Sequence, residues 1–229
     1  MIDLHSHLLP AVDDGSKDVR ESLALLRLLF GQGVRLVAAT PHFYANHESI
    51  ADFIARRSMA YEALVAQLPE GLPEIRLGAE VRYYPGISRL SDMRQLCLQG
   101  TNLLLLEMPF DRWTEYTLRE LSELAGSRGI QLVLAHIERY WKLQSRRVWE
   151  QLLADEVLMQ VNADAFAEFK TRSLALKLLK NHSVHFLGSD CHNLSVRPPR
   201  MDEAMTVIRR KMGEDFADQM IAFGESWFA

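Results

Sequence analysis

Short apolar runs alternate along this chain with longer stretches in which apolar positions recur every three or four residues. The short runs are typical of buried strands, and they cover residues 1–4, 34–39, 75–81, 102–107, 130–135, 157–161 and 184–187. The longer stretches have the period of amphipathic helices and cover residues 19–30, 50–68, 114–126, 165–179 and 202–212. Asp18, with Glu21 three residues later, predicts the start of the first helix.

This alternation of strands and helices predicts parallel strands joined by crossover helices. Seven near-continuously apolar strands, with no Gly-rich dinucleotide-binding turn, favour a closed barrel over an open doubly wound sheet. No segment rich in Pro, Gly or Ser divides the 229 residues. We therefore expect one α/β barrel domain that spans residues 1–229.

Composition narrows the classes of partner and compartment. A net charge of -4 and a pI of about 6.1 argue against a nucleic acid or an anionic membrane bound by bulk charge. No apolar run approaches the roughly 20 residues of a membrane span, and no signal peptide pattern is visible. Two cysteines make no disulfide framework, which fits a reducing compartment. We expect a cytoplasmic protein without membrane insertion.

Histidines and carboxylates recur where the predicted strands end. His5 and His7 follow the first strand at positions i and i+2, so their side chains share a face of extended backbone. A lone His-x-His pair is common by chance. Six further candidates stand at later strand ends: His42, Glu80, Glu107, His136, Asp190 and His192. Because active sites of such barrels lie at the carboxyl ends of the strands, this set predicts a metal centre there.

Several of these residue types also have ordinary structural roles. Glu107 ends a run of four leucines, where an ionised group must be paired or bound to metal. Asp13 and Asp14 precede Gly15 and could serve a turn, since Asp and Gly favour turns. We interpret the remaining histidines as structural: His47, His182 and His185.

Together these motifs resemble a known superfamily. The matching segments are His5-Ser6-His7, Asp13-Asp14-Gly15, Thr40-Pro41-His42, Gly78-Ala79-Glu80, Leu106-Glu107, His136-Ile137-Glu138-Arg139-Tyr140, Ser189-Asp190-Cys191-His192-Asn193 and Arg197-Pro198-Pro199. In order and spacing the chain is similar, over nearly its whole length, to the polymerase and histidinol phosphatase (PHP) superfamily. More narrowly, it resembles the bacterial metal-dependent protein tyrosine phosphatases of capsule and exopolysaccharide synthesis. The resemblance implies a distorted seven-stranded β/α barrel of the PHP type.

The resemblance also implies a cluster of three divalent ions, normally manganese. The first ion would be held by His5, His7, Glu80 and Asp190. Glu80 would bridge to a second ion bound by Glu107 and His136. The third ion would be held by Asp14, His42 and His192. Two arginines would contact phosphate, Arg139 and Arg197, and the implied partner is the phosphotyrosine tail of an autophosphorylating bacterial tyrosine kinase.

The chemistry of this ligand set agrees with that count. Two divalent ions would only neutralise the four carboxylates, whereas three leave a positive surplus that suits a phosphate monoester dianion. Imidazole and carboxylate without thiolate suit Mn, Fe or Zn. A tyrosine leaving group, with a pKa of about 10, needs less general-acid assistance than an alkyl alcohol. Aryl phosphates are therefore favoured substrates.

A cysteine mechanism is the first alternative, because Cys191 to Arg197 has the C-x5-R spacing of cysteine-dependent tyrosine phosphatases. No glycine lies between them to let backbone amides wrap a phosphate. Asp190 would raise the pKa of the thiol, and in extended backbone Cys191 points away from Asp190 and His192. The spacing is therefore interpreted as accidental.

Other functions remain open at this point. The main alternative is a small-molecule phosphomonoesterase such as a histidinol phosphatase. A proofreading exonuclease fits the acidic balance poorly, and an amidohydrolase would need a carboxylated lysine near Glu107. A metal-stabilised, non-catalytic partner of a kinase also stays possible. Three aromatic residues after strand ends are candidates for peptide contact, Phe43, Tyr44 and Trp113, and the closing Trp227-Phe228 could dock on the barrel or on another copy.

Overall fold

The structure is a computed structural model that describes residues 1–127 and 129–229. Its strands are β1 (Ile2–Ser6), β2 (Leu36–Ala39), β3 (His42–Phe43), β4 (Glu74–Leu77), β5 (Glu80–Arg82), β6 (Leu103–Glu107), β7 (Gln131–Leu134), β8 (Leu158–Asn162) and β9 (Phe186–Gly188). The α-helices are α1 (Val19–Gly31), α2 (Ile50–Val65), α3 (Glu115–Ser127), α4 (Arg146–Ala154), α5 (Asp164–Ala167), α6 (Phe169–Lys180), α7 (Met201–Met212) and α8 (Glu214–Ser226). Short 3-10 helices are η1 (Ile87–Arg89), η2 (Met93–Leu96), η3 (Ile137–Arg139) and η4 (Trp141–Leu143).

The strands pair in parallel, as predicted from the alternation of strands and helices. They form a three-stranded sheet in the order β1-β2-β4 and a six-stranded sheet in the order β3-β5-β6-β7-β8-β9. The expected count of seven strands in one barrel is therefore not confirmed.

The difference in count arises in the second and third predicted strands, each of which is interrupted. Residues 75–81 are split into β4 and β5, and β2 is followed by the separate strand β3 after Pro41. Proline has no N–H to donate to a ladder. Gly78 interrupts the other strand, and a Cβ there would lie 2.2 Å from Leu98 Cδ2. Backbone hydrogen bonds from Gly78 N to Ala39 O (2.9 Å) and from Glu80 N to Pro41 O (3.1 Å) still connect the segments.

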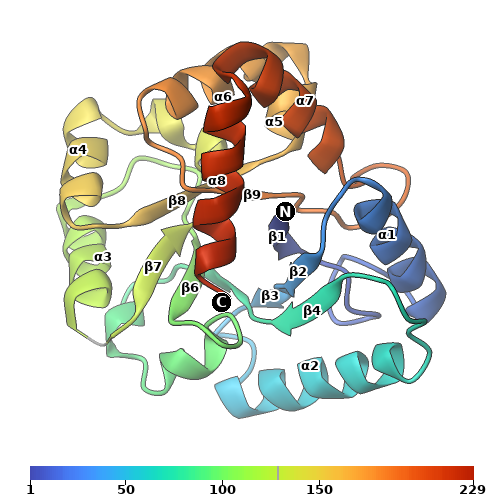
Figure 1. Ribbon diagram of the computed structural model, residues 1–229. Coiled ribbons are helices and arrows are strands. Elements are labelled where there is room, and N and C mark those ends of the chain that lie inside the picture. The colour runs from blue at the N-terminus through green and yellow to red at the C-terminus, as the bar shows by residue number, and fades with distance from the viewer. Residues whose placement is uncertain (128) are drawn as a thin grey trace.

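Hydrogen bonds also connect β1 with the chain just after β9, at the far edge of the larger sheet. Asp190 N donates to His5 O (2.7 Å), and His7 N donates to Cys191 O (2.9 Å). Figure 1 shows the resulting curled arrangement of strands with helices around its outside and α8 crossing in front. The curl brings the first and last strands together, although most of the sequence separates them.

Alternate side chains of the strands serve two hydrophobic clusters. On β6, Leu103 and Leu105 join a smaller cluster with Leu4, Val133 and Phe186, whereas neighbouring residues of the strand join the larger cluster. Trp227 and Phe228 pack against the smaller cluster. The end of the chain therefore docks on the same molecule, which settles one of the two roles that the sequence left open.

The helices agree with the predictions in part. Asp18 caps α1, because its Oδ1 accepts a hydrogen bond from Glu21 N (2.8 Å). The predicted helix at residues 165–179 is two helices, α5 and α6, because Glu168 has extended backbone between them. Helices α4 and α8 were not predicted. None of the described helices is long and apolar enough to cross a membrane.

Candidate metal centre

The nine predicted metal ligands converge at the carboxyl ends of the strands, and we refer to them as the candidate metal centre. They are His5, His7, Asp14, His42, Glu80, Glu107, His136, Asp190 and His192. Two positions differ slightly from expectation, since His42, expected after a strand, begins β3, and Glu80, expected at the end of a strand, begins β5. The shared end of parallel strands nevertheless gathers them into one place.

Around His5 the imidazoles of β1 meet two carboxylates. The Nε2 atoms of His5 and His7 lie 3.1 Å apart, and each lies 3.3 Å from Glu80 Oε2. Asp190 Oδ1 is 3.6 Å from His5 Nε2 and 3.4 Å from His7 Nε2. These four side chains are buried, so their polar atoms face one another rather than bulk water.

Glu80 is shared with a second group of side chains. Its Oε1 lies 2.8 Å from His136 Nε2, which in turn lies 3.6 Å from Glu107 Oε1. The other oxygen, Oε2, is 2.9 Å from His42 Nδ1. One carboxylate thus faces both groups, as a bridging ligand would.

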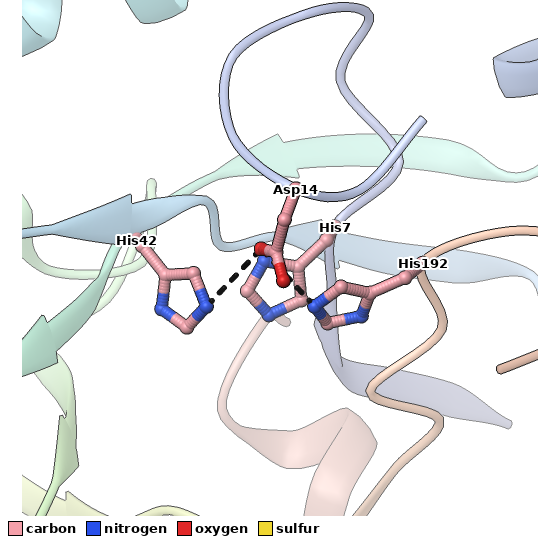
Figure 2. A group of neighbouring side chains, drawn as sticks. All are labelled: His7, Asp14, His42 and His192. Atoms are coloured by element: carbon pink, nitrogen blue, oxygen red, sulfur yellow. Dashed lines mark ion pairs between the residues drawn. The ribbon is translucent and has the colours of Figure 1, made fainter. Parts of the chain in front are cut away.

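The third group lies around Asp14, on the loop after β1. Asp14 Oδ1 is 3.5 Å from Nε2 of His42 and 3.5 Å from Nε2 of His192. Figure 2 shows the two imidazoles on either side of the carboxylate, with His7 behind it. Asp14 is the exposed member of the set, its side chain being 66% accessible.

Potential ligand atoms within 4.8 Å of one another fall into three groups among the described residues. They are His7-Asp14-His42-His192, His5-His7-Asp190 and His42-Glu80-Glu107. This grouping differs from the implied one, because His7 also joins the Asp14 group, His42 stands in place of His136 beside Glu80 and Glu107, and Glu80 is absent from the His5 group. Glu80 still contacts His5 and His7 through Oε2 (3.3 Å to each Nε2) and His136 through Oε1 (2.8 Å).

Several buried polar atoms in this cluster have no hydrogen bond among the described residues: Glu80 Oε2, His42 Nδ1 and His136 Nδ1. Although Glu80 Oε2 and His42 Nδ1 are close together, their geometry is not that of a hydrogen bond. A buried polar atom without a partner is costly. For Glu80 Oε2 and His42 Nδ1, which face the centre, a bound cation would remove that cost, so these residues fit a metal.

Protonation states also suit a cation. The pKa of His192 is lowered to about 4 by burial and by the nearby positive charges of His7 and Arg197, so its imidazole is neutral, as a ligand must be. Burial alone would lower the pKa of His5, but the negative charges of Glu80 and Asp190 outweigh it and raise that pKa. The carboxylates therefore favour positive charge at this point, whether a proton or a metal ion supplies it.

Residues outside the nine ligands orient the imidazoles: Asp13, which the sequence analysis interpreted only as a turn residue, and Gln160 and Asn162, which it missed. His7 Nδ1 donates to Asp13 Oδ2 (2.7 Å), and His5 Nδ1 donates to Gln160 Oε1 (3.3 Å). Gln160 Nε2 donates to Asn162 Oδ1 (2.9 Å), and Asn162 Nδ2 donates to Asp190 Oδ2 (2.7 Å). These bonds leave Nε2 of both histidines directed into the centre, an arrangement typical of metal-binding histidines.

Backbone geometry is unusual at two residues of the centre. His136 has φ +31° and Asp190 has φ +50°, in the left-handed region that non-glycine residues seldom adopt. Gly188 comes so close to β1 that a Cβ would lie 2.6 Å from His5 Cβ. Strained conformations persist where the surroundings enforce them, which is common at functional sites.

The two predicted phosphate-binding arginines flank Asp190. Arg139 Nη2 and Arg197 Nη2 each donate to Asp190 Oδ2 at 2.6 Å. Arg197 Nη1 also donates to His192 Nε2 (2.8 Å). Both side chains are about one-third exposed, so their remaining N–H groups are accessible from solvent. A third arginine that was not predicted, Arg82, pairs with Glu107 (2.6 Å).

Cys191 lies in an environment that disfavours a thiolate. Its side chain is fully buried, and burial together with the negative charge of Asp3 raises the pKa of the thiol to about 12. A nucleophilic cysteine needs a lowered pKa and access to substrate. The spacing between Cys191 and Arg197 therefore does not describe a cysteine phosphatase.

Of the three aromatic residues proposed for peptide contact, two are buried and one is partly exposed. Phe43 and Trp113 are buried in the larger hydrophobic cluster, so this expectation was wrong for them, because Phe43 lies within β3 and the loop that carries Trp113 packs on the core. Tyr44 is partly exposed, with its ring 5.4 Å from that of His42. Phe110, which was not singled out, is the exposed aromatic beside His136.

Comparisons with known proteins agree with this picture. The tyrosine-protein phosphatase CpsB of Streptococcus agalactiae is 32% identical over 233 residues, which cover 96% of this chain and 94% of that protein. The tyrosine-protein phosphatase YwqE of Bacillus subtilis is 29% identical over 226 residues, 94% of this chain and 86% of that protein.

A solved structure is also similar over the whole chain. It comes from work on YwqE from Bacillus subtilis and CpsB from Streptococcus pneumoniae, described as unique metal-dependent tyrosine phosphatases. It matches with a TM-score of 0.86 and 26% identity, covering 100% of this chain and 94% of that one. The family model for capsular polysaccharide synthesis, CpsB/CapC, matches residues 1–225. The chain therefore belongs to the CpsB/CapC family, in agreement with the resemblance found in its sequence.

Proposed function

We propose that this protein is a metal-dependent phosphotyrosine-protein phosphatase. The observation that supports it best is the convergence of the nine side chains of the candidate metal centre beside Arg139 and Arg197. The relatives named tyrosine-protein phosphatases support the same activity. They do not favour a small-molecule phosphomonoesterase such as a histidinol phosphatase.

The fold that carries this activity is, in our proposal, a single PHP-type barrel domain over residues 1–229. If β2 with β3, and β4 with β5, are each taken as one interrupted strand, seven strand positions result. The hydrogen bonds between β1 and the end of β9 would then close the barrel.

For the metals, we propose three divalent ions, with manganese first and iron or zinc as alternatives. The proposed ligands are those implied by the resemblance, with Glu80 shared between two ions. Ions bound there would supply positive charge to the transferring phosphoryl group and would lower the pKa of a nucleophilic water. The buried carboxylates Glu80 and Asp190 suit divalent ions because they are ionised. Burial would raise their pKa values, but the histidines around them lower these values well below the usual range.

Besides the metal ions, two side chains of the protein would bind the phosphate group of the substrate, Arg139 and Arg197. Asp190 Oδ2 accepts one N–H from each guanidinium, which fixes both groups beside the centre. Their remaining N–H donors can then bind phosphate oxygens, for which the planar guanidinium is well suited. Because the positions are set before substrate arrives, little reorganisation is needed on binding.

The proposed physiological substrate is the phosphotyrosine tail of an autophosphorylating bacterial tyrosine kinase that controls capsule or exopolysaccharide synthesis. Membership of the CpsB/CapC family supports the setting of capsule synthesis. Such a substrate places the phosphatase in the cytoplasm.

The test combines metal analysis with turnover. Purified protein should contain divalent metal and should hydrolyse a phosphotyrosine peptide faster than a phosphoserine peptide or histidinol phosphate. Exhaustive dialysis against EDTA should abolish the activity, and added Mn²⁺ should restore it. His5→Ala, Glu80→Ala and Asp190→Ala should lose both metal and activity, while His182→Ala, in a turn away from the centre, should keep both. Full activity in a metal-free variant would refute the proposal.

A further inference from the structure

Phe110 lies on the loop between β6 and α3, three residues after Glu107. Its ring centroid is 6.0 Å from that of His136, with the two planes inclined by 21°. The side chain is 46% exposed. A single exposed aromatic ring is common on protein surfaces. What distinguishes Phe110 is its place beside a proposed ligand of the candidate metal centre, His136.

The loop that carries Phe110 is firmly held. Trp113 Nε1 donates to Pro109 O (3.1 Å), and Trp113 N donates to Gln144 Oε1 (3.1 Å). Gln144 Nε2 donates to Asp111 O (2.7 Å). Trp113 itself is buried. The exposed ring is thus presented on an ordered segment and not on a loosely attached one.

Arg82 completes this part of the site. Its guanidinium carbon lies 5.8 Å from the centroid of the Phe110 ring, and its Nη1 donates to Glu107 Oε2 (2.6 Å). The arginine therefore packs on the ring while it is tied to the centre. Such an arrangement restricts the motion of the phenyl group and adds a cation–π contact.

Resting on the proposed function, we propose that Phe110, restrained by Arg82, is a specificity-determining residue that receives the aromatic ring of an aryl phosphate. In a phosphotyrosine only one oxygen separates the ring from phosphorus. When the phosphate lies at the metal centre, the substrate ring must therefore lie just outside it, where Phe110 stands. A phosphoserine side chain has no ring to place against Phe110.

The test uses two ligands that cannot be hydrolysed, benzylphosphonate and ethylphosphonate, so that the leaving group plays no part. Their affinities for the manganese-loaded protein are measured by calorimetry, which needs no turnover. The unaltered protein should bind benzylphosphonate more tightly. Phe110→Ala should weaken benzylphosphonate by about two- to tenfold, the usual contribution of an aromatic pair, with ethylphosphonate unchanged. Phe110→Trp should retain the preference.

Phe30→Ala is the matched control. Phe30 is 38% exposed and also carries an arginine over its ring, Arg35 at 4.3 Å, but it lies at the end of α1 that leads to the amino end of β2. This variant should keep the preference for benzylphosphonate. If the preference is absent in the unaltered protein or survives in Phe110→Ala, the inference about Phe110 is wrong while the proposed phosphatase can stand. If neither phosphonate binds, the inference about Phe110 is also wrong, and the proposed phosphatase is decided by its own test of metal content and turnover.

Discussion

Asp13 accepts a hydrogen bond from His7, with 2.7 Å between Asp13 Oδ2 and His7 Nδ1. The same carboxylate accepts from His42 N (2.9 Å) and from Gly15 N (3.0 Å). Burial would raise the pKa of Asp13, but the hydrogen bond and charge of His7 lower it below its usual range. Asp13 therefore serves the turn and at the same time orients an imidazole of the candidate metal centre.

Replacing this carboxylate should weaken metal binding. Asp13→Asn keeps an acceptor for His7 but removes the negative charge, so His7 becomes a poorer ligand. We expect a loss of about 10- to 100-fold in metal affinity, the usual effect of altering such an outer residue. Competition against a fluorescent chelator measures it. Asp18→Asn is the control, because Asp18 caps α1 and asparagine is an equally good cap. Unchanged metal affinity in Asp13→Asn would mean that Asp13 stabilises the turn but does not support His7 as a metal ligand.

Arg139 offers a test of substrate binding apart from metal binding. Arg139→Ala removes charged hydrogen-bond donors worth about 1.5–3 kcal/mol, so kcat/KM for a phosphotyrosine peptide should fall about 10- to 100-fold. Metal content, measured by elemental analysis, should stay unchanged. Arg146→Ala is the control, since its side chain is 91% exposed on α4.

Because Arg139 also donates to Asp190, the variant has a second possible result. If metal is lost together with activity, Arg139 acts by holding a ligand in place. In that case its assignment as a phosphate-binding residue is incorrect, whatever the change in kcat/KM.

Replacing Cys191 distinguishes the metal mechanism from a cysteine mechanism. Since the thiol is buried and its pKa is raised to about 12, Cys191→Ala should retain most of the activity on a phosphotyrosine peptide. The unaltered enzyme should also resist iodoacetamide, which alkylates accessible thiolates. A folded, metal-loaded Cys191→Ala protein without activity would restore the cysteine mechanism.

The sequence predicted much of the candidate metal centre because its residues differ in kind from the strands that carry them. His5 and His7 interrupt an apolar run, and Glu107 ends another, so each is visible without a structure. Gln160 and Asn162 gave the same signal, two polar residues at i and i+2 on the otherwise apolar β8. They were not predicted because an amide side chain is not itself a usual ligand of such metals. An amide can orient a ligand as well as a carboxylate does.

Other features depended on contacts that no local pattern contains. The interruption at Gly78 follows from the close approach of Leu98, twenty residues later in the chain. Phe43 and Trp113 looked exposed because they follow strands, yet tertiary packing buries both. Helix α8 was missed although Ala217, Met220 and Ile221 on it pack in or against the larger cluster. Position along a strand predicts which face a side chain takes, but not what later covers that face.

His185 provides a prediction about stability that is independent of the metal ligands. Its Nδ1 accepts a hydrogen bond from Met159 N (3.1 Å), and burial lowers its pKa from the ordinary 6.5 to about 4. Between these two values the unfolded chain binds a proton that the folded protein does not. The contribution of His185 to the free energy of unfolding is therefore complete above pH 6.5 and falls as the pH drops towards 4.

His185→Asn should remove this pH dependence, because an asparagine oxygen can accept from Met159 N without titrating. Urea unfolding at pH 7 and pH 5 measures it, and the decrease in stability between them should be smaller in the variant. The variant and the unaltered protein are compared at the same metal content, so the titration of the candidate metal centre contributes equally to both decreases in stability and cancels in their difference. His182→Asn, at an exposed position three residues earlier, controls for loss of an imidazole and should show the full decrease. An equal decrease in His185→Asn would mean that His185 is protonated in the folded protein as readily as in the unfolded chain.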